Sequence, residues 1–246
     1  MEVVCCSIKD SPRFRYRGMM LDCARHFHSV EQVKRLINLL AHYKFNTFHW
    51  HLTDDEGWRI EIKSLPQLTD IGAWRGIDET IEPQYTHLTQ RYGGFYTQEQ
   101  IKDVVAFAAQ RGITIIPEID VPGHCRAAIK SLPHLLVEAE DKTEYRSIQH
   151  YNDNVINCSA GSYEFIDKVL EEVAALFPAP YVHIGADEVP NGVCLRAFLP
   201  SSYGAIGLYR LQRATRALLT SCRRQATKIR QTNGRLGRSP TRQQSE

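Results

Sequence analysis

Short apolar runs that end in polar residues alternate with helix-like segments along most of the chain, and this alternation most constrains the fold. Four such runs cover residues 19–22, 45–52, 113–120 and 181–186. Strands that alternate with helices form parallel βα units. Strands that are apolar on both faces form a sheet covered by helices. We therefore predict an α/β fold built on a parallel sheet.

Two capping-box patterns mark helix starts between these strands. Ser29 is followed three residues later by Gln32, and Thr97 by Gln100. In such a box the hydroxyl and the amide satisfy backbone N–H groups that the first helical turn leaves free. Apolar residues follow both boxes at helical spacing, and Gly112 suits the end of the second helix.

The other connections are less regular. A long polar stretch runs from residue 53 to residue 96, and a helical patch is expected near 127–136. A fourth clear helix is expected to open at Ser162 and to end before Pro178, because proline disfavours helix in the residue that precedes it.

The strand ends carry the side chains that could do chemistry. In α/β barrels and in open α/β sheets, sites lie at the carboxyl ends of the strands. We therefore expect the polar residues of the four strand ends to form one shared site. They are Asp22 and Arg25, His51 and Asp54, Glu118 and Asp120, and Asp187 and Glu188. Phosphate-binding glycine motifs are missing from these turns, which counts against a nucleotide site.

Asp187 and Glu188 are adjacent acids at a strand end. Neighbouring strand residues rise about 3.3 Å and point to opposite faces, so the pair does not flank a sugar as two catalytic carboxylates roughly 5–9 Å apart would. Where the chain curls, one acid could be a general acid and the other could orient the substrate and help to keep its neighbour protonated. The alternative is a helix start with Asp187 as its cap.

His49 and His51 share one face of their strand, and Trp50 lies on the other. One hypothesis is a metal-dependent hydrolase that uses both histidines with His124, because imidazoles and a carboxylate such as Asp54 are common metal ligands. The alternative is a pair of hydrogen-bonded histidines that line the core.

Arg25 and His124 have two interpretations each. The planar guanidinium of Arg25 can grip two adjacent hydroxyls or a carboxylate, or it can form an ion pair with Asp22. His124 follows a Pro-Gly turn and could relay a proton or be structural. Trp50 and Trp58 could stack on sugar rings or pack in the core.

Composition excludes some classes of protein. The 246 residues are 43% hydrophobic and 24% charged, as is typical of a globular domain. Apolar runs of the roughly 18 residues that a membrane helix needs are missing, and the first residues contain no recognisable signal peptide. Seven cysteines without a CxxC pair suggest free thiols rather than a zinc site or a disulfide framework.

Four segments together resemble a known family: "YRGMMLDCARHF", "FHWHLTDDEGWRIEI", "GGFYTQEQIKDVVAFAAQRGITIIPEIDVPGH" and "HIGADEV". In order and spacing they are similar to the catalytic domain of glycoside hydrolase family 20, the β-N-acetylhexosaminidases, above all to its chitobiase-like branch. The resemblance covers about residues 8–193. It implies a TIM (β/α)8 barrel, of which about the first four βα units are recognisable here.

The resemblance also implies a function. The family hydrolyses terminal non-reducing N-acetylhexosamine residues of oligosaccharides or glycoconjugates, without a cofactor or metal, by a retaining mechanism in which the substrate's acetamido oxygen is the nucleophile. By motif position, Glu188 matches the general acid/base and Asp187 the residue that holds the acetamido N–H. Arg25 matches the arginine that grips the sugar hydroxyls, and Asp54 and His124 match a supporting pair.

The pattern departs from the family at both ends. We predict a remnant of a preceding domain or a linker at 1–15, a partial barrel at 16–193 and an unrelated tail at 194–246, disordered or partly helical. After Glu188 there are 11 lysines and arginines against one acid. Because only about the first four βα units of the barrel are recognisable, we expect the activity of this chain to be impaired. The alternative is a non-catalytic fragment that binds sugar weakly. A tail that anchors to nucleic acid or to an anionic membrane is a further alternative. The sequence indicates neither compartment nor oligomeric state.

Overall fold

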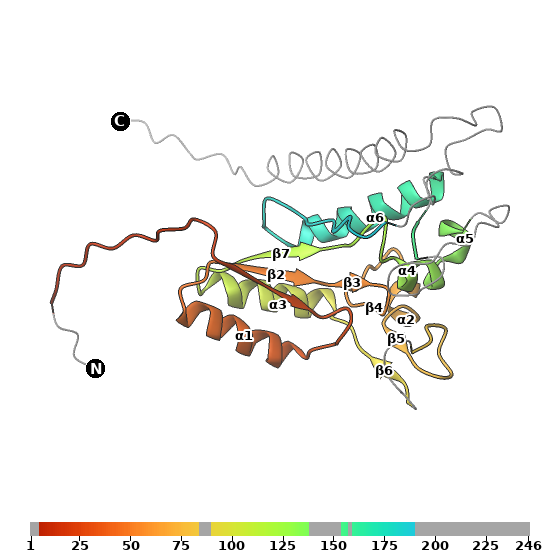
Figure 1. Cartoon of the computed structure of the whole chain (residues 1–246), viewed down its shortest axis with the longest axis horizontal. Coiled ribbons are helices and arrows are strands. Elements are labelled where there is room, and N and C mark those ends of the chain that lie inside the picture. The colour runs from red at the N-terminus through yellow and green to blue at the C-terminus, as the bar shows by residue number, and fades with distance from the viewer. Residues whose placement is uncertain (1–4, 84–89, 138–153, 157–158, 190–246) are drawn as a thin grey trace, which may run out of the picture.

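A parallel three-stranded sheet forms the centre of the molecule (Figure 1). The computed structural model describes residues 5–83, 90–137, 154–156 and 159–189. The sheet has the order β1-β2-β7, and its strands are β1 (Gly18–Asp22), β2 (Thr47–His51) and β7 (Thr114–Glu118). Parallel neighbours need a crossover between them, and α1 and α3 supply it. The predicted parallel α/β sheet is confirmed.

Helices α1 (Val30–His42) and α3 (Gln98–Ala109) begin where the capping boxes predict. In each helix the hydroxyl at the N-cap accepts a hydrogen bond from a backbone N–H, and the glutamine side chain accepts one in return. Helix α3 packs against α1, β7 and α6 (Ala160–Leu176). These contacts bury the apolar faces of the helices around the sheet.

Helix α6 begins earlier than predicted. Ser159, not Ser162, is its N-cap, and the Ser159 hydroxyl accepts a hydrogen bond from the Ser162 backbone N–H. Ser162 is instead fully buried in the first turn, where its backbone N–H is the group that the cap satisfies. The end before Pro178 is confirmed. The predicted helical patch is two short helices, α4 (Arg126–Ser131) and α5 (Pro133–Leu136).

The polar stretch after β2 contributes a large part of the core. Its described residues, 53–83 and 90–96, form four short strands and one short helix, namely β3 (Thr53–Asp54), β4 (Gly57–Trp58), α2 (Gln67–Asp70), β5 (Trp74–Arg75) and β6 (Tyr92–Gly93). Trp58, Ile60 and Ile62 are buried in it and join the main hydrophobic cluster. Its polar composition hides this role, because the apolar residues are few and dispersed.

The buried guanidinium of Arg59 lies inside this stretch. None of its described hydrogen bonds is to a carboxylate. Arg59 is fully buried and donates to the backbone carbonyls of Cys23, Ala24, Ala73 and Gly94. Burial lowers its pKa to about 10, and the nearby Arg75 adds to the effect. These hydrogen bonds tie two loops to the segment that leads into Arg25.

The segment expected to be a fourth strand is only a short extension of the sheet. Residues 181–186 make a single parallel bridge, between Glu118 and His183. Backbone hydrogen bonds run from His183 to Pro117, from Ile119 to His183 and from Val121 to Ile184. The chain then turns away, because Gly185 and Ala186 adopt left-handed backbone angles that break strand pairing.

The strand register aligns polar residues in one row. Asp22 pairs with His51, and His51 pairs with Glu118. The bridge between Glu118 and His183 extends the row. Register partners of neighbouring strands point to the same face, so these four side chains gather at the carboxyl edge of the sheet, where a shared site was predicted.

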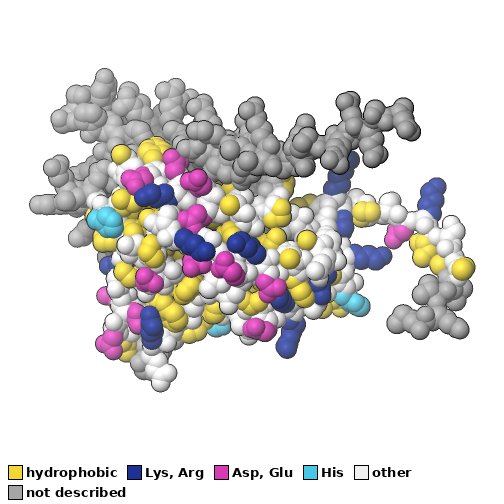
Figure 2. Space-filling view, turned by 180° about the vertical axis from the view of Figure 1, so that it is seen from behind, with side chains coloured by type: hydrophobic (Ala, Val, Ile, Leu, Met, Phe, Trp, Pro, Cys, Tyr) yellow, Lys and Arg dark blue, Asp and Glu magenta, His cyan; other side chains and the backbone are white. Residues whose placement is uncertain are grey.

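The outer surface mixes both signs of charge. Figure 2 shows acidic and basic side chains next to one another, with hydrophobic ones between them, on the face that it presents. Strand β1 at the sheet edge is half-exposed at Met19 and Met20, so helices do not cover both faces there as predicted. Among the described helices, none is long and apolar enough to cross a membrane.

Candidate active site

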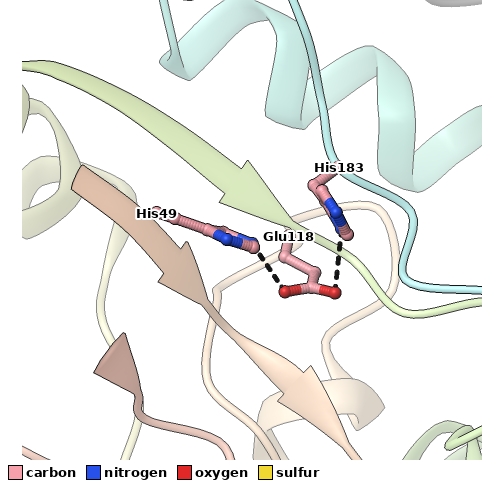
Figure 3. A group of neighbouring side chains, drawn as sticks. All are labelled: His49, Glu118 and His183. Atoms are coloured by element: carbon pink, nitrogen blue, oxygen red, sulfur yellow. Dashed lines mark ion pairs between the residues drawn. The ribbon is translucent and has the colours of Figure 1, made fainter. Parts of the chain in front are cut away.

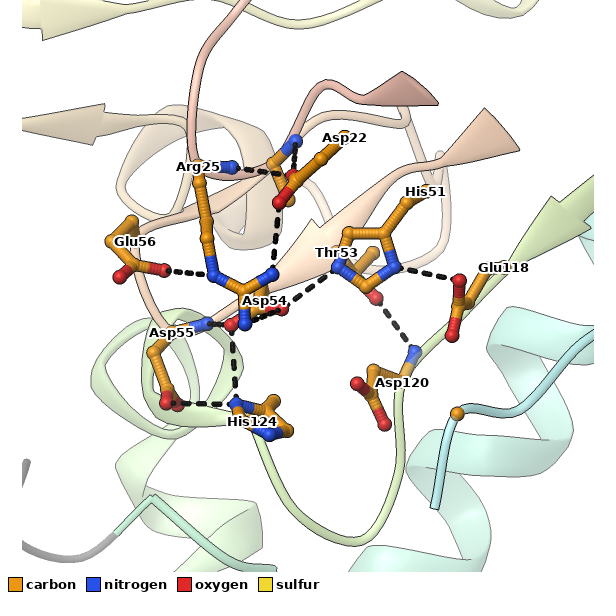
Figure 4. Close-up of polar contacts among 12 residues, drawn as sticks. Asp22, Arg25, His51, Thr53, Asp54, Asp55, Glu56, Glu118, Asp120 and His124 are labelled. Carbon is orange, nitrogen blue, oxygen red and sulfur yellow. Dashed lines mark hydrogen bonds and ion pairs between the residues drawn. The ribbon is translucent and has the colours of Figure 1, made fainter. Parts of the chain in front are cut away.

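Arg25 lies beyond the end of β1 and is held by three carboxylates (Figure 4). Its Nη1 lies 2.8 Å from Asp22 Oδ2, its Nη2 3.0 Å from Asp54 Oδ2 and its Nε 3.7 Å from Glu56 Oε2. Asp22 also accepts hydrogen bonds from the backbone N–H groups of Ala24 and Arg25. The Arg25 side chain is still 40% exposed. Both proposed roles are therefore compatible, because the ion pairs hold the fork and leave part of it accessible.

Asp54 is the buried centre of the site. Its Oδ2 lies 2.7 Å from His51 Nε2 and also contacts Arg25, and its Oδ1 lies 3.3 Å from His124 Nδ1. The Oδ1 atom also accepts a hydrogen bond from the backbone N–H of Asp55 at 2.7 Å. Burial alone favours the neutral acid, but His124, His51 and Arg25 hold the pKa of Asp54 well below its usual range. Asp54 is therefore a carboxylate.

His124 connects the buried acids to the exposed ones. Its Nδ1 lies 3.3 Å from both Asp54 Oδ1 and Asp55 Oδ2, and its Nε2 lies 3.5 Å from Glu188 Oε2. Burial would lower the pKa of His124, but Asp54 and Asp55 raise it to about 11. His124 is therefore an imidazolium whose Nε2 lies close to Glu188, in an electrostatic contact that is not aligned as a hydrogen bond.

Asp187 and Glu188 follow the left-handed turn at Gly185 and are both exposed. Glu188 itself has a left-handed φ of 46°, so the two acids do not continue a strand. A carboxylate oxygen of Asp187 lies in one compact group with atoms of Asp120 and His124, all within 4.8 Å of one another. The curl of the chain thus brings both acids to one site, as the sequence suggested, and neither caps a described helix.

Asp120 is buried below this turn. Its Oδ1 accepts a hydrogen bond from the Ala186 backbone N–H at 3.0 Å, and its own N–H donates to the Thr53 hydroxyl at 2.9 Å. Burial raises the pKa of Asp120 to about 8, and the nearby Asp54 and Asp187 add to the rise. The side chain is therefore a neutral acid at neutral pH.

A second polar group lies deeper along the same row. Glu118 Oε2 lies 2.6 Å from His49 Nε2, and Glu118 Oε1 lies 2.9 Å from His183 Nδ1 (Figure 3). His51 Nδ1 also approaches Glu118 Oε2, at 2.8 Å. Ligand atoms around a tetrahedral zinc ion lie roughly 3.3 Å apart, because each bond is about 2 Å long. The shorter separations here do not fit ligands of one zinc ion, and they are close electrostatic contacts: His49 Nε2 and His51 Nδ1 are not aligned as hydrogen-bond donors, and His183 Nδ1 accepts a hydrogen bond from the Gly185 backbone N–H.

The metal hypothesis that joins His49, His51 and His124 is not supported by their positions. His49 and His51 face Glu118, whereas His124 faces Asp54 across the site. The three imidazoles point to different carboxylates because the β2 register directs the first two toward β7. They therefore do not share one coordination point.

The sequence missed three residues that shape the site. The Asp55 carboxylate contacts His124, and it accepts hydrogen bonds from the Arg126 backbone N–H at 3.0 Å and from the Asn154 side-chain amide at 2.9 Å. Glu56 faces Arg25. The doubled acid after the HxH pattern was the available signal for Asp55, but Asn154 carried none, because it lies 99 residues from Asp55 in the chain.

The tryptophans that could have stacked on a sugar belong to the core. Trp50 is fully buried and donates to Cys23 Sγ, and Trp58 is 1% exposed and donates to the Ile60 carbonyl. Trp74 is covered by the Arg91 guanidinium, 3.9 Å from its ring centre. Aromatic walls for a sugar do not come from these three residues.

Acids, an arginine and a histidine gather at the carboxyl ends of parallel strands, where (β/α)8 barrels place their active sites. The family model of the glycosyl hydrolase family 20 catalytic domain matches residues 14–233. The chain belongs to this family, and its fold is part of a TIM barrel. The match extends past residue 193, where we predicted the barrel part to end. Both domain limits stay predictions, and the predicted tail lies outside the described residues.

Known relatives agree with the family. A β-hexosaminidase of Vibrio furnissii is 74% identical over 187 residues, which are 76% of this chain and 31% of that protein. A crystal structure of the Vibrio harveyi exo-β-N-acetylglucosaminidase in complex with N-acetylglucosamine is 75% identical, with a TM-score of 0.81, and matches 92% of this chain and 36% of that one. The Streptomyces coelicolor β-N-acetylhexosaminidase is 32% identical, with a TM-score of 0.67, over 89% of this chain and 39% of that one. The chain therefore spans about a third of the length of these relatives.

Proposed function

We propose that the chain carries the catalytic acids of a β-N-acetylhexosaminidase. The enzyme removes terminal non-reducing N-acetyl-D-hexosamine from oligosaccharides or glycoconjugates by a retaining, substrate-assisted mechanism. The observation that carries the proposal is the connected line Asp54–His124–Glu188, with contacts of 3.3 and 3.5 Å. It links a buried carboxylate to an exposed acid at the strand ends, and the names of the relatives support the substrate class.

Glu188 is the proposed general acid and base. It donates a proton to the leaving glycosidic oxygen, and the proton on His124 Nε2 then stabilises the carboxylate that remains. In the second step Glu188 takes a proton from the attacking water. Asp54 keeps His124 charged and oriented for both steps.

Asp187 is the proposed partner of the substrate's acetamido group. Its carboxylate accepts a hydrogen bond from the acetamido N–H, which turns the acetamido oxygen toward the anomeric carbon. The same negative charge stabilises the positive charge that develops on the oxazolinium ring. Two adjacent acids serve one site because neither has to be the nucleophile.

Arg25 is the proposed grip on the sugar hydroxyls. Asp22, Asp54 and Glu56 fix its guanidinium on one side, and its exposed part can donate to two adjacent hydroxyls. A fixed fork loses little freedom on binding, so it can position the ring over Asp187 and Glu188.

A second candidate is sugar binding without hydrolysis. The burial of Trp50 and Trp58 in the core favours it, because the chain's own tryptophans then leave the acetamido group without an aromatic wall. Loose positioning of the substrate costs most of the rate of an intramolecular attack. This candidate retains Arg25 and Asp54 as the binding residues.

Hydrolysis of a chromogenic N-acetyl-β-glucosaminide by the purified protein tests the proposal. Glu188→Gln should abolish turnover, and Glu171→Gln, the same change on an exposed face of α6, should leave it unchanged. Turnover that survives in Glu188→Gln would refute the acid/base role. Calorimetric binding of N-acetylglucosamine without any turnover would favour the second candidate. Loss of turnover on treatment with EDTA would instead favour a metal-dependent hydrolase.

A further inference from the structure

His51 lies between two carboxylates with both ring nitrogens engaged. Its Nε2 lies 2.7 Å from Asp54 Oδ2 and its Nδ1 lies 2.8 Å from Glu118 Oε2 (Figure 4). The side chain is 5% exposed. The contact at Nδ1 is close but not aligned as a hydrogen bond, so its strength is mainly electrostatic.

The charge state of His51 follows from these two contacts. A neutral imidazole carries one N–H, and its other nitrogen presents a lone pair. Either neutral tautomer would place that lone pair against a carboxylate oxygen at less than 3 Å. The imidazolium has no lone pair facing either acid, so the two close contacts favour a positive charge on His51 by electrostatic attraction.

We infer that Glu118 is a positioning residue that keeps His51 charged and, through His51, holds the Asp54 carboxylate in place for Arg25 and His124. The inference rests on the proposed function and extends it to a row of residues below the reacting groups. The described side-chain contacts of Glu118 are with His49, His51 and His183, so we infer that it acts through other side chains and not on the substrate.

Asp54 transmits the effect because it is a shared anchor. Its Oδ2 contacts both His51 and Arg25, and its Oδ1 contacts His124. A buried carboxylate that loses one charged partner shifts or takes up a proton. Either change would move the sugar-gripping Arg25 and the His124 that supports Glu188 together.

Glu118 is suited to this role because it is crowded by positive or protonatable groups. His49 lies 2.6 Å and His183 2.9 Å from its oxygens (Figure 3). Burial would raise the pKa of Glu118, but His49 and His51 hold it well below its usual range. Glu118 therefore remains a carboxylate and a fixed counter-ion.

The charged groups around His51 determine the pH range over which its ring stays protonated. It faces Asp54 on β3, Glu118 on β7 and Asp120 beyond β7. Arg25 and His124 lie behind Asp54, and His49 and His183 lie behind Glu118. Burial would lower the pKa of His51, but Asp54 and Glu118 raise it to about 10.

The stability that the positive charge of His51 adds to the folded site is therefore complete below the ordinary histidine pKa of about 6.5. It is lost as the pH rises through the folded pKa near 10. Without the Glu118 charge, the same loss should occur closer to neutral pH. The fall of activity at high pH in the pH–activity profile then depends on Glu118, although this residue does not touch the substrate.

The test compares wild type with Glu118→Gln, Glu118→Asp and the exposed control Glu171→Gln. Nitrogen NMR of ¹⁵N-histidine-labelled protein follows the ring of His51 from pH 6 to 10, with His51→Gln to assign it. The turnover number and KM for the chromogenic N-acetyl-β-glucosaminide are measured over the same range, and circular dichroism checks the fold.

In wild type, His51 should remain an imidazolium to about pH 9. In Glu118→Gln it should become neutral at least one pH unit lower, and kcat/KM at pH 8 should fall by about 10²-fold, as misplacement by about 1 Å does. Glu118→Asp, which keeps the charge, should recover part of the alkaline limb, and Glu171→Gln should match wild type.

An unchanged His51 titration in folded Glu118→Gln would overturn the inference, and so would an unchanged pH profile. A stoichiometric metal ion that is lost in His49→Ala would also overturn it, because the cluster would then hold a cation instead of protons. If wild type lacks turnover but its His51 titration depends on Glu118, the proposed function fails while the charge assignment stands.

Discussion

His124 Nε2 lies 3.5 Å from the Glu188 carboxylate, on the side of the ring opposite to Asp54. A histidine between a buried carboxylate and an exposed acid can stabilise that acid after it has given up its proton.

Replacement of His124 by asparagine should lower kcat on the order of 10²-fold, within the range for acid–base catalysis. Asparagine tolerates the left-handed backbone at this position, where φ is 52°, so the loss should reflect the missing imidazolium and not the fold. Steady-state kinetics with a denaturation curve checks this. A kcat within twofold of wild type would contradict the role of His124.

Alanine at Gly185 should disrupt the site, whereas alanine at Gly112 should not. Both glycines have left-handed angles, with φ of 55° and 69°, so each substitution should cost about 1–2 kcal/mol of stability. A Cβ at Gly185 would lie 2.0 Å from Asp120 Oδ1, while a Cβ at Gly112 meets nothing within 4 Å.

The comparison of Gly185→Ala with Gly112→Ala therefore separates the cost of backbone strain from damage to the turn that bears Asp187 and Glu188. Activity and thermal unfolding of both variants should show a similar strain cost but a loss of turnover in Gly185→Ala alone. Equal turnover in the two variants would show that the turn tolerates displacement of Asp120.

Asp120→Asn should flatten the dependence of stability on pH. The folded pKa of about 8 lies above the ordinary value of 3.8, so the folded state holds its proton more tightly than the unfolded state. The resulting stability is full below about pH 4 and is lost as the pH rises toward 8, with a slope of at most about 1.4 kcal/mol per pH unit.

Asparagine has no proton to lose and can still accept the hydrogen bond from the Ala186 N–H. Urea unfolding at pH 5, 6, 7 and 8 should therefore give a smaller decline than in wild type or in the exposed control Asp167→Asn. Parallel curves for all three proteins would mean that Asp120 is charged when folded.

Arg59→Lys should destabilise the fold by about 2–4 kcal/mol, because an ammonium cannot reach the carbonyls that the guanidinium fork serves and hydrogen bonds to charged groups are strong. The exposed change Arg35→Lys on α1 should have little effect. Equilibrium unfolding in urea measures both free energies. A cost below about 0.5 kcal/mol for Arg59→Lys would contradict the structural role.

Local patterns predicted the three strands of the main sheet and the helices α1, α3 and α6, but not α2 or β3 to β6. The boxes at Ser29 and Thr97 work because their partners lie three residues apart, so no distant contact is needed. The start of α6 was predicted three residues too late, because serines at positions 159 and 162 both suit an N-cap. In the structure Ser159 is the cap and Ser162 lies buried in the first turn.

The candidate site was predictable in its members but not in its connections. Arg25, Asp54, His124, Asp187 and Glu188 all follow predicted strands, and they do gather at one edge. The contacts of Glu118 with three histidines depend on the parallel register of β2 and β7 and on the bridge to His183. A change of register by one residue would turn these side chains to the other face.

The sequence by itself determined the order of the main-sheet strands and of α1, α3 and α6, the caps at Ser29 and Thr97 and the acids at the strand ends, because each depends on neighbours a few residues away. Only the tertiary structure decided that Arg59 is a buried hub, that Trp50 and Trp58 belong to the core, and that His51 lies between Asp54 and Glu118. Those outcomes depend on burial and register between distant segments, and the free energies of these contacts arise only when the segments meet.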